Sequence, residues 1–178
     1  MSKIAGYLVL VGVSEFLFLM LIAEFLYPGY SVSHNYISDL GVGKTAIIFN
    51  TAIIMMGILI IIASILIRNT VKPSFTTYTI LLTGLGAMFV GIFPETTGMP
   101  HLISALIAFL FGGISSILTS VYERNYFWTA LGLITLVSLA LFIAKSYEGL
   151  GPGGMERLIV YPELIWGISF GTRLLSNR

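Results

Sequence analysis

The chain has 178 residues and a net charge of +1, and 57% of its residues are hydrophobic while only 10% are charged. Its mean hydropathy is +0.98. This composition lies outside the range of soluble globular domains and predicts an integral membrane protein. The charge excludes nucleic acid as a partner, because there is no basic stripe to neutralise phosphates. The absence of cysteine excludes disulfides and thiolate metal sites.

Taken in chain order, six apolar stretches are long enough to span a membrane, if roughly 20 residues make one span. They are residues 4–27, 45–67, 76–93, 100–121, 126–145 and 156–175. Each is predicted to be a helix, because a chain in lipid must satisfy its own backbone hydrogen bonds and these runs are too long for barrel strands. The first run is also longer than the apolar core of a signal peptide. We expect an all-α, polytopic membrane protein with residues 1–178 as one six-helix transmembrane domain.

Short polar or glycine- and proline-containing segments separate the predicted helices, as expected for turns. The separating segments are Pro28-Gly29, Pro73-Ser74, Pro94 with Gly98 and Pro100, the turn 122–125, and residues 149–154. The last segment, Gly-Leu-Gly-Pro-Gly-Gly, is predicted to be a flexible loop that precedes the final helix.

Basic residues indicate how the helices are oriented. The side that carries both termini holds Lys3, Arg68, Lys72, Arg124, Arg173 and Arg178, whereas the other side holds only Lys44, Lys145 and Arg157. By the positive-inside rule, both termini are predicted to face the cytoplasm in a multi-pass protein of the cell membrane.

Acidic residues and histidines show the opposite asymmetry. Those expected at or near the extracytoplasmic side are Glu24, Asp39, Glu95, Glu148, Glu156, Glu163, His34 and His101. Apart from Glu24 and Glu148, they fall in three segments: residues 33–41, residues 93–95 with His101, and residues 156–163. We expect these segments to form the walls of one polar site at that membrane face.

The first segment offers imidazole, amide and carboxylate groups in one short loop, from His34, Asn35 and Asp39. Such a set could bind a divalent metal such as zinc, or a histidine could act as a general base oriented by a carboxylate. Alternatively, the loop is folded by its own side-chain hydrogen bonds, with Asn35 and Asp39 as turn-forming or capping residues.

His101 opens the fourth predicted helix, beside a row of small residues at every fourth position. The row consists of Ser104, Ala108, Gly112, Ser116 and Ser120. Small residues at this spacing permit close helix packing, so His101 is expected to face a neighbouring helix rather than lipid. Two histidines are too few for a three-histidine zinc site.

The last helix is predicted to begin with Glu156 and Arg157, followed by Tyr161 and Glu163. Glu156 and Glu163 are seven residues apart and share nearly one helix face, which Gly167 and Gly171 extend as a close-packing pair. Glu163 is expected roughly 10 Å inside the helix start, where a buried carboxylate needs Arg157, His101 or a metal as partner. Alternatively, an ion pair between Arg157 and a glutamate locks two helices together.

Glu15 is the charged residue expected near the middle of the membrane, where an ionised carboxylate normally faces the bundle interior. It is either a proton carrier or cation ligand, or a hydrogen-bonded packing residue. Glu24 points to the opposite side of the same helix, so the two do not form a carboxylate pair.

These motifs resemble a known family. Asn35 to Gly41, Gly91 to Pro94 with His101 and Ala105, and Glu156-Arg157 with Tyr161, Pro162 and Trp166 resemble the six-helix prokaryotic membrane proteins of the domain-of-unknown-function nine-nine-eight family. The likeness covers nearly the whole chain and implies the fold but no function. The Tyr36-Ile37-Ser38-Asp39 core, His101 and an acidic residue near Trp166 also resemble the eukaryotic DRAM and Sfk membrane proteins, which implies a role in lipid handling.

Two functions are therefore expected as alternatives. In the first, the protein is an enzyme, a hydrolase or transferase, acting on a lipid or lipid-linked substrate. The catalytic or metal-binding residues would be His34, Asp39, His101 and Glu163, and the substrate-binding residues Asn35, Glu156, Arg157 and Tyr161. In the second, it is a non-catalytic lipid-binding protein or an accessory subunit with a membrane protein partner or in a homo-oligomer. A proton-coupled carrier using Glu15 ranks last, because no broken helix is evident.

Overall fold

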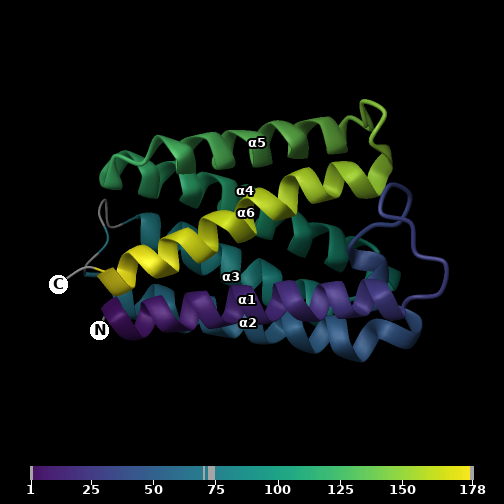
Figure 1. The fold of residues 1–178 in the computed structure, drawn as a ribbon, viewed down its shortest axis with the longest axis horizontal. Helices are drawn as coiled ribbons and strands as arrows, with labels where there is room; N and C mark the ends of the chain where they lie inside the picture. Colours follow the sequence, from purple (N-terminus) through teal and green to yellow (C-terminus); the bar gives the residue numbers. More distant parts are fainter. Residues whose placement is uncertain (1, 70, 72–74, 177–178) are drawn as a thin grey trace.

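The structure, a computed structural model, describes residues 2–69, 71 and 75–176. Six long helices run side by side along the longest axis of the molecule (Figure 1). The start of the first long helix and the end of the last lie at the same end of the bundle, as an even number of antiparallel helices requires. The predicted turn at Pro73-Ser74, and Lys72 and Arg178, lie outside the described residues.

The predicted all-helical fold is confirmed in the described part of the chain. The long helices are α1 (Ser2–Leu26), α2 (Ala46–Ile67), α3 (Thr76–Ile92), α4 (Met99–Glu123), α5 (Tyr126–Ile143) and α6 (Gly151–Ser176). The short 3-10 helices η1 (Ser38–Gly41), η2 (Gly43–Thr45) and η3 (Glu95–Thr97) lie in the connections. Five of the long helices are long and apolar enough to cross a membrane, and α3, with 17 residues, is shorter. Its length is at the lower end of the range for a spanning helix.

The helices form a closed arrangement. Each packs against the next in sequence, and α6 packs against α1, while α4 also contacts α6 across the bundle. The connections 27–45, 93–98 and 144–150 lie together at the end opposite the termini, here named the loop end (Figure 1). The three segments predicted to form a polar site are therefore brought to the loop end or to the helix portions that begin there.

Small residues set the close approach of neighbouring helices. A Cβ atom on Gly57 of α2 would lie 2.5 Å from the backbone nitrogen of Met88 in α3. The predicted packing roles of Gly167 and Gly171 are confirmed: their nearest neighbours are Val13 and Leu10 of α1. Such contacts replace the hydrophobic effect, which lipid does not supply, as the force that holds membrane helices together.

The predicted start of the last helix is wrong. Helix α6 begins at Gly151, within the glycine-rich stretch predicted to be a flexible loop. The backbone nitrogen of Gly153 donates to the Ser33 carbonyl at 3.0 Å, and a Cβ there would lie 2.0 Å from the Asn35 carbonyl oxygen. The glycines thus let the helix start dock on the 31–35 loop. Glu163 consequently lies about 18 Å from the helix start, deeper than expected.

Candidate functional site

The three predicted segments meet at the loop end. The backbone nitrogen of Ile37 donates to Oε2 of Glu156 at 2.5 Å, which ties the first segment to α6. The carboxyl groups of Asp39 and Glu95 are hydrogen bonded to each other, which ties the first segment to η3. Residues separated by more than a hundred positions in the sequence therefore form one polar layer.

The loop preceding η1 is held by its own side chains, as one of the two predicted alternatives states. Asn35 donates through Nδ2 to Oδ2 of Asp39 at 2.8 Å, and the Tyr36 backbone nitrogen donates to the same oxygen at 3.0 Å. Asn35 Oδ1 in turn accepts from the Ser31 backbone nitrogen at 3.0 Å. The amide and carboxylate thus act as turn-forming groups.

His34 is exposed and lies apart from the other predicted site residues that line the interior. Its Nδ1 is 3.0 Å from Oγ of Ser31 and 2.9 Å from Oγ of Ser33. Within the described residues, no three histidine, aspartate or glutamate side chains are grouped closely enough to hold a metal ion. The predicted metal set of His34, Asp39, His101 and Glu163 is therefore not brought together, because the first two belong to the loop and the last two line the interior.

Arg157 is the centre of a buried network that joins α1, α6 and the loop. Its NH2 group donates to Glu24 at 2.5 Å and to the Tyr30 hydroxyl at 2.6 Å. Its NH1 group donates to the carbonyls of Val32 and Gly153, each at 2.9 Å. The predicted helix-locking ion pair is thus present, with Glu24 as the acid. Its Nε is buried and has no hydrogen-bond partner among the described residues. Because both terminal nitrogens are bound by groups of the protein itself, the arrangement favours a structural role over headgroup binding.

Aromatic hydroxyl groups complete the network. The Tyr30 hydroxyl donates to the Tyr36 carbonyl at 3.0 Å, and its pKa is raised by burial. Tyr161, predicted to bind substrate, lies close to Arg157 instead. Burial and a hydrogen bond with Tyr147 raise the pKa of Tyr36 to about 12. The hydroxyl groups of Tyr30 and Tyr36 therefore stay neutral at physiological pH, and the Tyr30 hydroxyl helps to hold the loop.

His101 is buried and lies in the first turn of α4. Its Nδ1 is 2.9 Å from the Phe93 carbonyl oxygen, and because a carbonyl only accepts, Nδ1 carries the proton. Nε2 of the neutral ring is then left as an acceptor. The expectation that His101 faces other helices rather than lipid is met.

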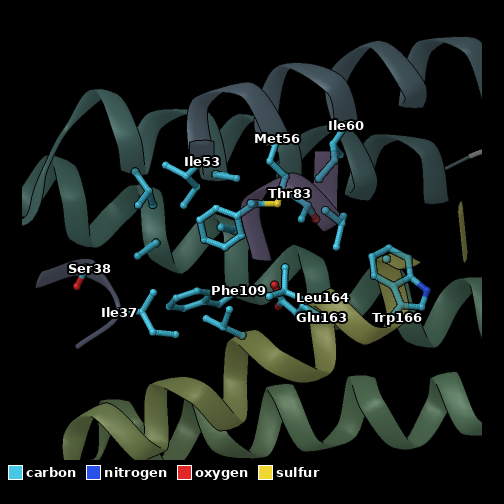
Figure 2. A pocket seen from close by; sticks show the side chains of 18 of the residues that line it. Ile37, Ser38, Ile53, Met56, Ile60, Thr83, Phe109, Glu163, Leu164 and Trp166 are labelled. Atoms are coloured by element: carbon cyan, nitrogen blue, oxygen red, sulfur yellow. The ribbon is translucent and has the colours of Figure 1, made fainter. Parts of the chain in front are cut away.

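A cavity of about 90 Å³ lies inside the bundle, between α1, α2, α3, α4 and α6. Its walls are apolar apart from a few side chains: Ser38, Thr83, His101, Glu156 and Glu163. In the close view, Ser38 lies at one end and Trp166 at the other (Figure 2). The polar residues of the first and second segments lie at the loop end of this cavity.

Glu163 lines the middle of the cavity, on a face of α6 that meets α4. A Cβ atom on Gly112 would lie 2.4 Å from Cδ of Glu163, so the carboxyl packs directly on the α4 backbone. Its Oε1 is buried and has no hydrogen-bond partner among the described residues. The predicted partners of Glu163, Arg157 and His101, are engaged elsewhere.

A second hollow of about 350 Å³ lies at the loop end and is lined by Tyr27, Asp39, Val42, Glu95 and Thr96. Burial, together with the hydrogen bond and the like charge of Asp39, raises the pKa of Glu95 to about 7. Asp39 and Glu95 thus line this second hollow together, and neither lines the central cavity.

Glu15 does not line the central cavity, and its Oε2 is buried with no hydrogen-bond partner in the part of the chain that the structure describes. Both interpretations of Glu15 stay predictions.

The sequence reasoning missed Tyr30 and Ser38. Ser38 lies in the polar segment already singled out, whereas nothing in the sequence marks Tyr30, because its contacts come from α6.

The helices carry large apolar side chains on their outward faces, among them Phe25, Ile47 and Tyr126. Such a surface would be unstable in water and suits a lipid environment. With its polar loop end and internal cavity, the chain is a multi-pass, all-helical membrane protein.

More particularly, the chain belongs to the family described as Protein of unknown function (DUF998), which matches residues 10–173. No curated protein and no solved structure matches the chain. The likeness to the DRAM and Sfk proteins stays a prediction.

Proposed function

We propose that this protein binds the apolar chain of a membrane lipid or lipid-linked molecule in its central cavity. The polar part of the ligand lies at the loop end, near Ser38, His101 and Glu156. The observation that carries the proposal is the cavity itself, which combines apolar walls with a few polar groups gathered mainly at one end. This combination is typical of ligand sites, in which apolar surface supplies affinity and a few polar groups supply orientation.

The surroundings of the cavity favour hydrocarbon over a polar solute. Five helices contribute side chains such as Phe16, Phe49 and Phe109, none of which offers a hydrogen bond. A polar solute would lose its hydration there without compensation, whereas part of a hydrocarbon chain would lose nothing. In a membrane the most abundant molecules with such chains are lipids.

A cavity-filling substitution tests the proposal. Ala105 is partly buried and lines the cavity on α4, so Ala105→Leu should fill part of it. Native mass spectrometry of the protein purified in mild detergent should show bound lipid in the original chain and several-fold less in the variant. Ala130→Leu on the exposed face of α5 is the matched control. Equal lipid retention by Ala105→Leu and the original chain would contradict the proposal.

A second candidate is a hydrolase or transferase acting on the same lipid, and the geometry of His101 favours it. The bond from Nδ1 to the Phe93 carbonyl leaves Nε2 as the basic atom, and the ring lines the cavity. A histidine held in this way is suited to general base catalysis on a bond placed at the loop end. Glu156 and Glu163 are the nearby acids of the cavity.

Turnover of isotope-labelled phospholipids in proteoliposomes tests the enzymatic candidate. His101→Gln should abolish turnover, whereas His34→Ala, which alters the exposed histidine, should retain it. Absence of turnover by the original chain, across anionic, zwitterionic and glycosylated lipids, would leave lipid binding as the proposed function.

A role as an accessory subunit or homo-oligomer stays a proposal, and purification as a lone, stable monomer would count against it.

A further inference from the structure

The carboxyl of Glu163 packs against the backbone of α4 at Gly112, where no side chain blocks it. Gly112 has no side chain, and the carboxyl of Glu163 fills the space that a side chain there would need. A Cβ atom on Gly112 would lie 2.4 Å from the carboxyl carbon and within 2.6 Å of both carboxyl oxygens. The backbone N–H of Gly113 also lies close to the carboxyl. The group is therefore positioned, rather than merely tolerated, in the wall of the cavity.

Despite this support, one oxygen is left without a partner. Oε1 is buried and accepts no hydrogen bond from any described residue, and the side chain lines the cavity (Figure 2). A buried polar atom without a partner is costly in an apolar environment whether the carboxyl is charged or neutral. The cavity thus contains an unsatisfied hydrogen-bonding atom part of the way along its apolar wall.

The position of this atom constrains the ligand. Glu156 and Glu163 both line the cavity and are seven residues apart on α6, a separation of about 10 Å along the helix axis. We propose that the ligand of the central cavity is an amphiphile with a second polar group, a hydroxyl or amine about 10 Å from its polar end, which donates a hydrogen bond to Oε1 of Glu163. This inference rests on the proposed function and specifies the class of lipid.

The test uses long-chain alcohols that differ only in the middle of the chain. Octadecane-1,10-diol carries a donor at the required depth, 10-methoxyoctadecan-1-ol replaces it with a group that cannot donate, and octadecan-1-ol has neither. Each is used to displace labelled octadecan-1-ol from the purified protein. The original chain should bind the diol about tenfold more tightly than the methoxy compound, as expected for one hydrogen bond in a dry site.

Variants of Glu163 identify the atom responsible. Glu163→Leu should bind the diol and the methoxy compound equally. Glu163→Gln keeps an oxygen that accepts a hydrogen bond, so it should retain the preference for the diol. It carries no negative charge, so it should not favour 10-aminooctadecan-1-ol over the diol. Gly112→Ala should reduce the preference by displacing the carboxyl, which is the flexible end of its side chain and can move without unfolding the protein. Glu148→Gln, at an exposed position outside the cavity, is the control.

The possible failures are distinct. If the original chain binds all three alcohols equally and Ala105→Leu weakens them all, the inference about Glu163 is overturned and the proposed function stands. If none of the alcohols binds in a way that Ala105→Leu weakens, the proposed function fails and the inference fails with it. If Glu163→Leu still prefers the diol, the hydroxyl in the middle of the chain donates to an acceptor other than Glu163. That result would also overturn the inference.

Discussion

At the scale of single residues, Arg157 does more to hold the loop end together than its position in the sequence indicates. The side chains of Arg157 and Glu24 are only 5% and 14% exposed. Removing one member of a buried pair leaves the other charge without compensation. The same pair type occurs at the opposite end of the bundle between Arg173 and Glu123, where the Arg173 side chain is 47% exposed.

This contrast yields a prediction about stability. Arg157→Met should lower the free energy of unfolding by about 3–5 kcal/mol, because it leaves Glu24 unpaired. Arg173→Met, the matched control, should cost less than about 1 kcal/mol, since solvent screens that pair. Circular dichroism during denaturant unfolding in detergent measures both. An Arg157→Met variant as stable as the original chain but depleted of lipid would favour the headgroup-binding role over the locking role.

Glu95 predicts a pH dependence of the loop. The folded-state pKa of Glu95, about 7, is above its usual value of 4.5, so the folded loop binds the proton more tightly than the unfolded loop does. The resulting stabilisation is fully present below about pH 4.5 and is lost as the pH rises through about 7. After solvent screening it amounts to about 1 kcal/mol.

Hydrogen exchange of residues 31–42, corrected for the intrinsic pH effect, should therefore show less protection at pH 8 than at pH 5. Glu95→Gln, which cannot ionise, should show the same protection at both values. A loop in the original chain whose protection does not change between pH 5 and 8 would contradict the assigned pairing with Asp39.

At the scale of helices, packing is governed by positions at which backbone meets backbone. Gly57 on α2 faces the α3 backbone, with a would-be Cβ 2.5 Å from the Met88 nitrogen and 2.7 Å from the Gly84 carbonyl oxygen. Gly12 on α1 faces α2 less closely, since its would-be Cβ is 3.2 Å from side-chain atoms of Leu59. Backbone cannot yield to a new methyl group as a side chain can.

We therefore expect Gly57→Ala to separate α2 from α3 and to lower the free energy of unfolding by about 1–3 kcal/mol or more. Gly12→Ala should have a smaller effect, because the nearest atoms, Cβ and Cδ1 of Leu59, are 3.2 Å away and need to give by only a few tenths of an ångström. Thermal unfolding of the two variants in the same detergent compares them. Equal melting temperatures would mean that the α2–α3 contact is looser than described.

At the scale of the whole molecule, the arrangement of the bundle places the start of α1 and the end of α6 at one end and the connections 27–45, 93–98 and 144–150 at the other (Figure 1). If the positive-inside rule holds here, the terminal end faces the cytoplasm. The chain contains no cysteine, so single cysteines can be introduced without background.

In intact cells, a membrane-impermeant maleimide should label Lys145→Cys, which is exposed at the loop end. Ser176→Cys, exposed at the last residue of α6 and so at the opposite end, should be labelled only after the cells are opened. The reverse pattern would place the loop end at the cytoplasmic face, and it would leave the fold unaffected.

The number of helices and most of their boundaries follow from the sequence alone, because in lipid only apolar helices of sufficient length are stable. The gathering of the polar segments at one end follows as well, since alternating helices bring every second connection to the same side. Even the self-contained loop formed by Asn35 and Asp39 was among the alternatives, because its hydrogen bonds join residues close in sequence.

Other features depend on contacts between distant segments and were decided only by the tertiary structure. Helix α6 begins early because Gly153 docks on a loop more than a hundred residues away. Arg157 selects Glu24 rather than Glu163 because the α1–α6 contact places Glu24 within reach. The cavity exists because five helices leave space between them, and no local pattern of residues encodes that space. The sequence therefore determines which segments span the membrane, and helix packing determines which polar groups meet.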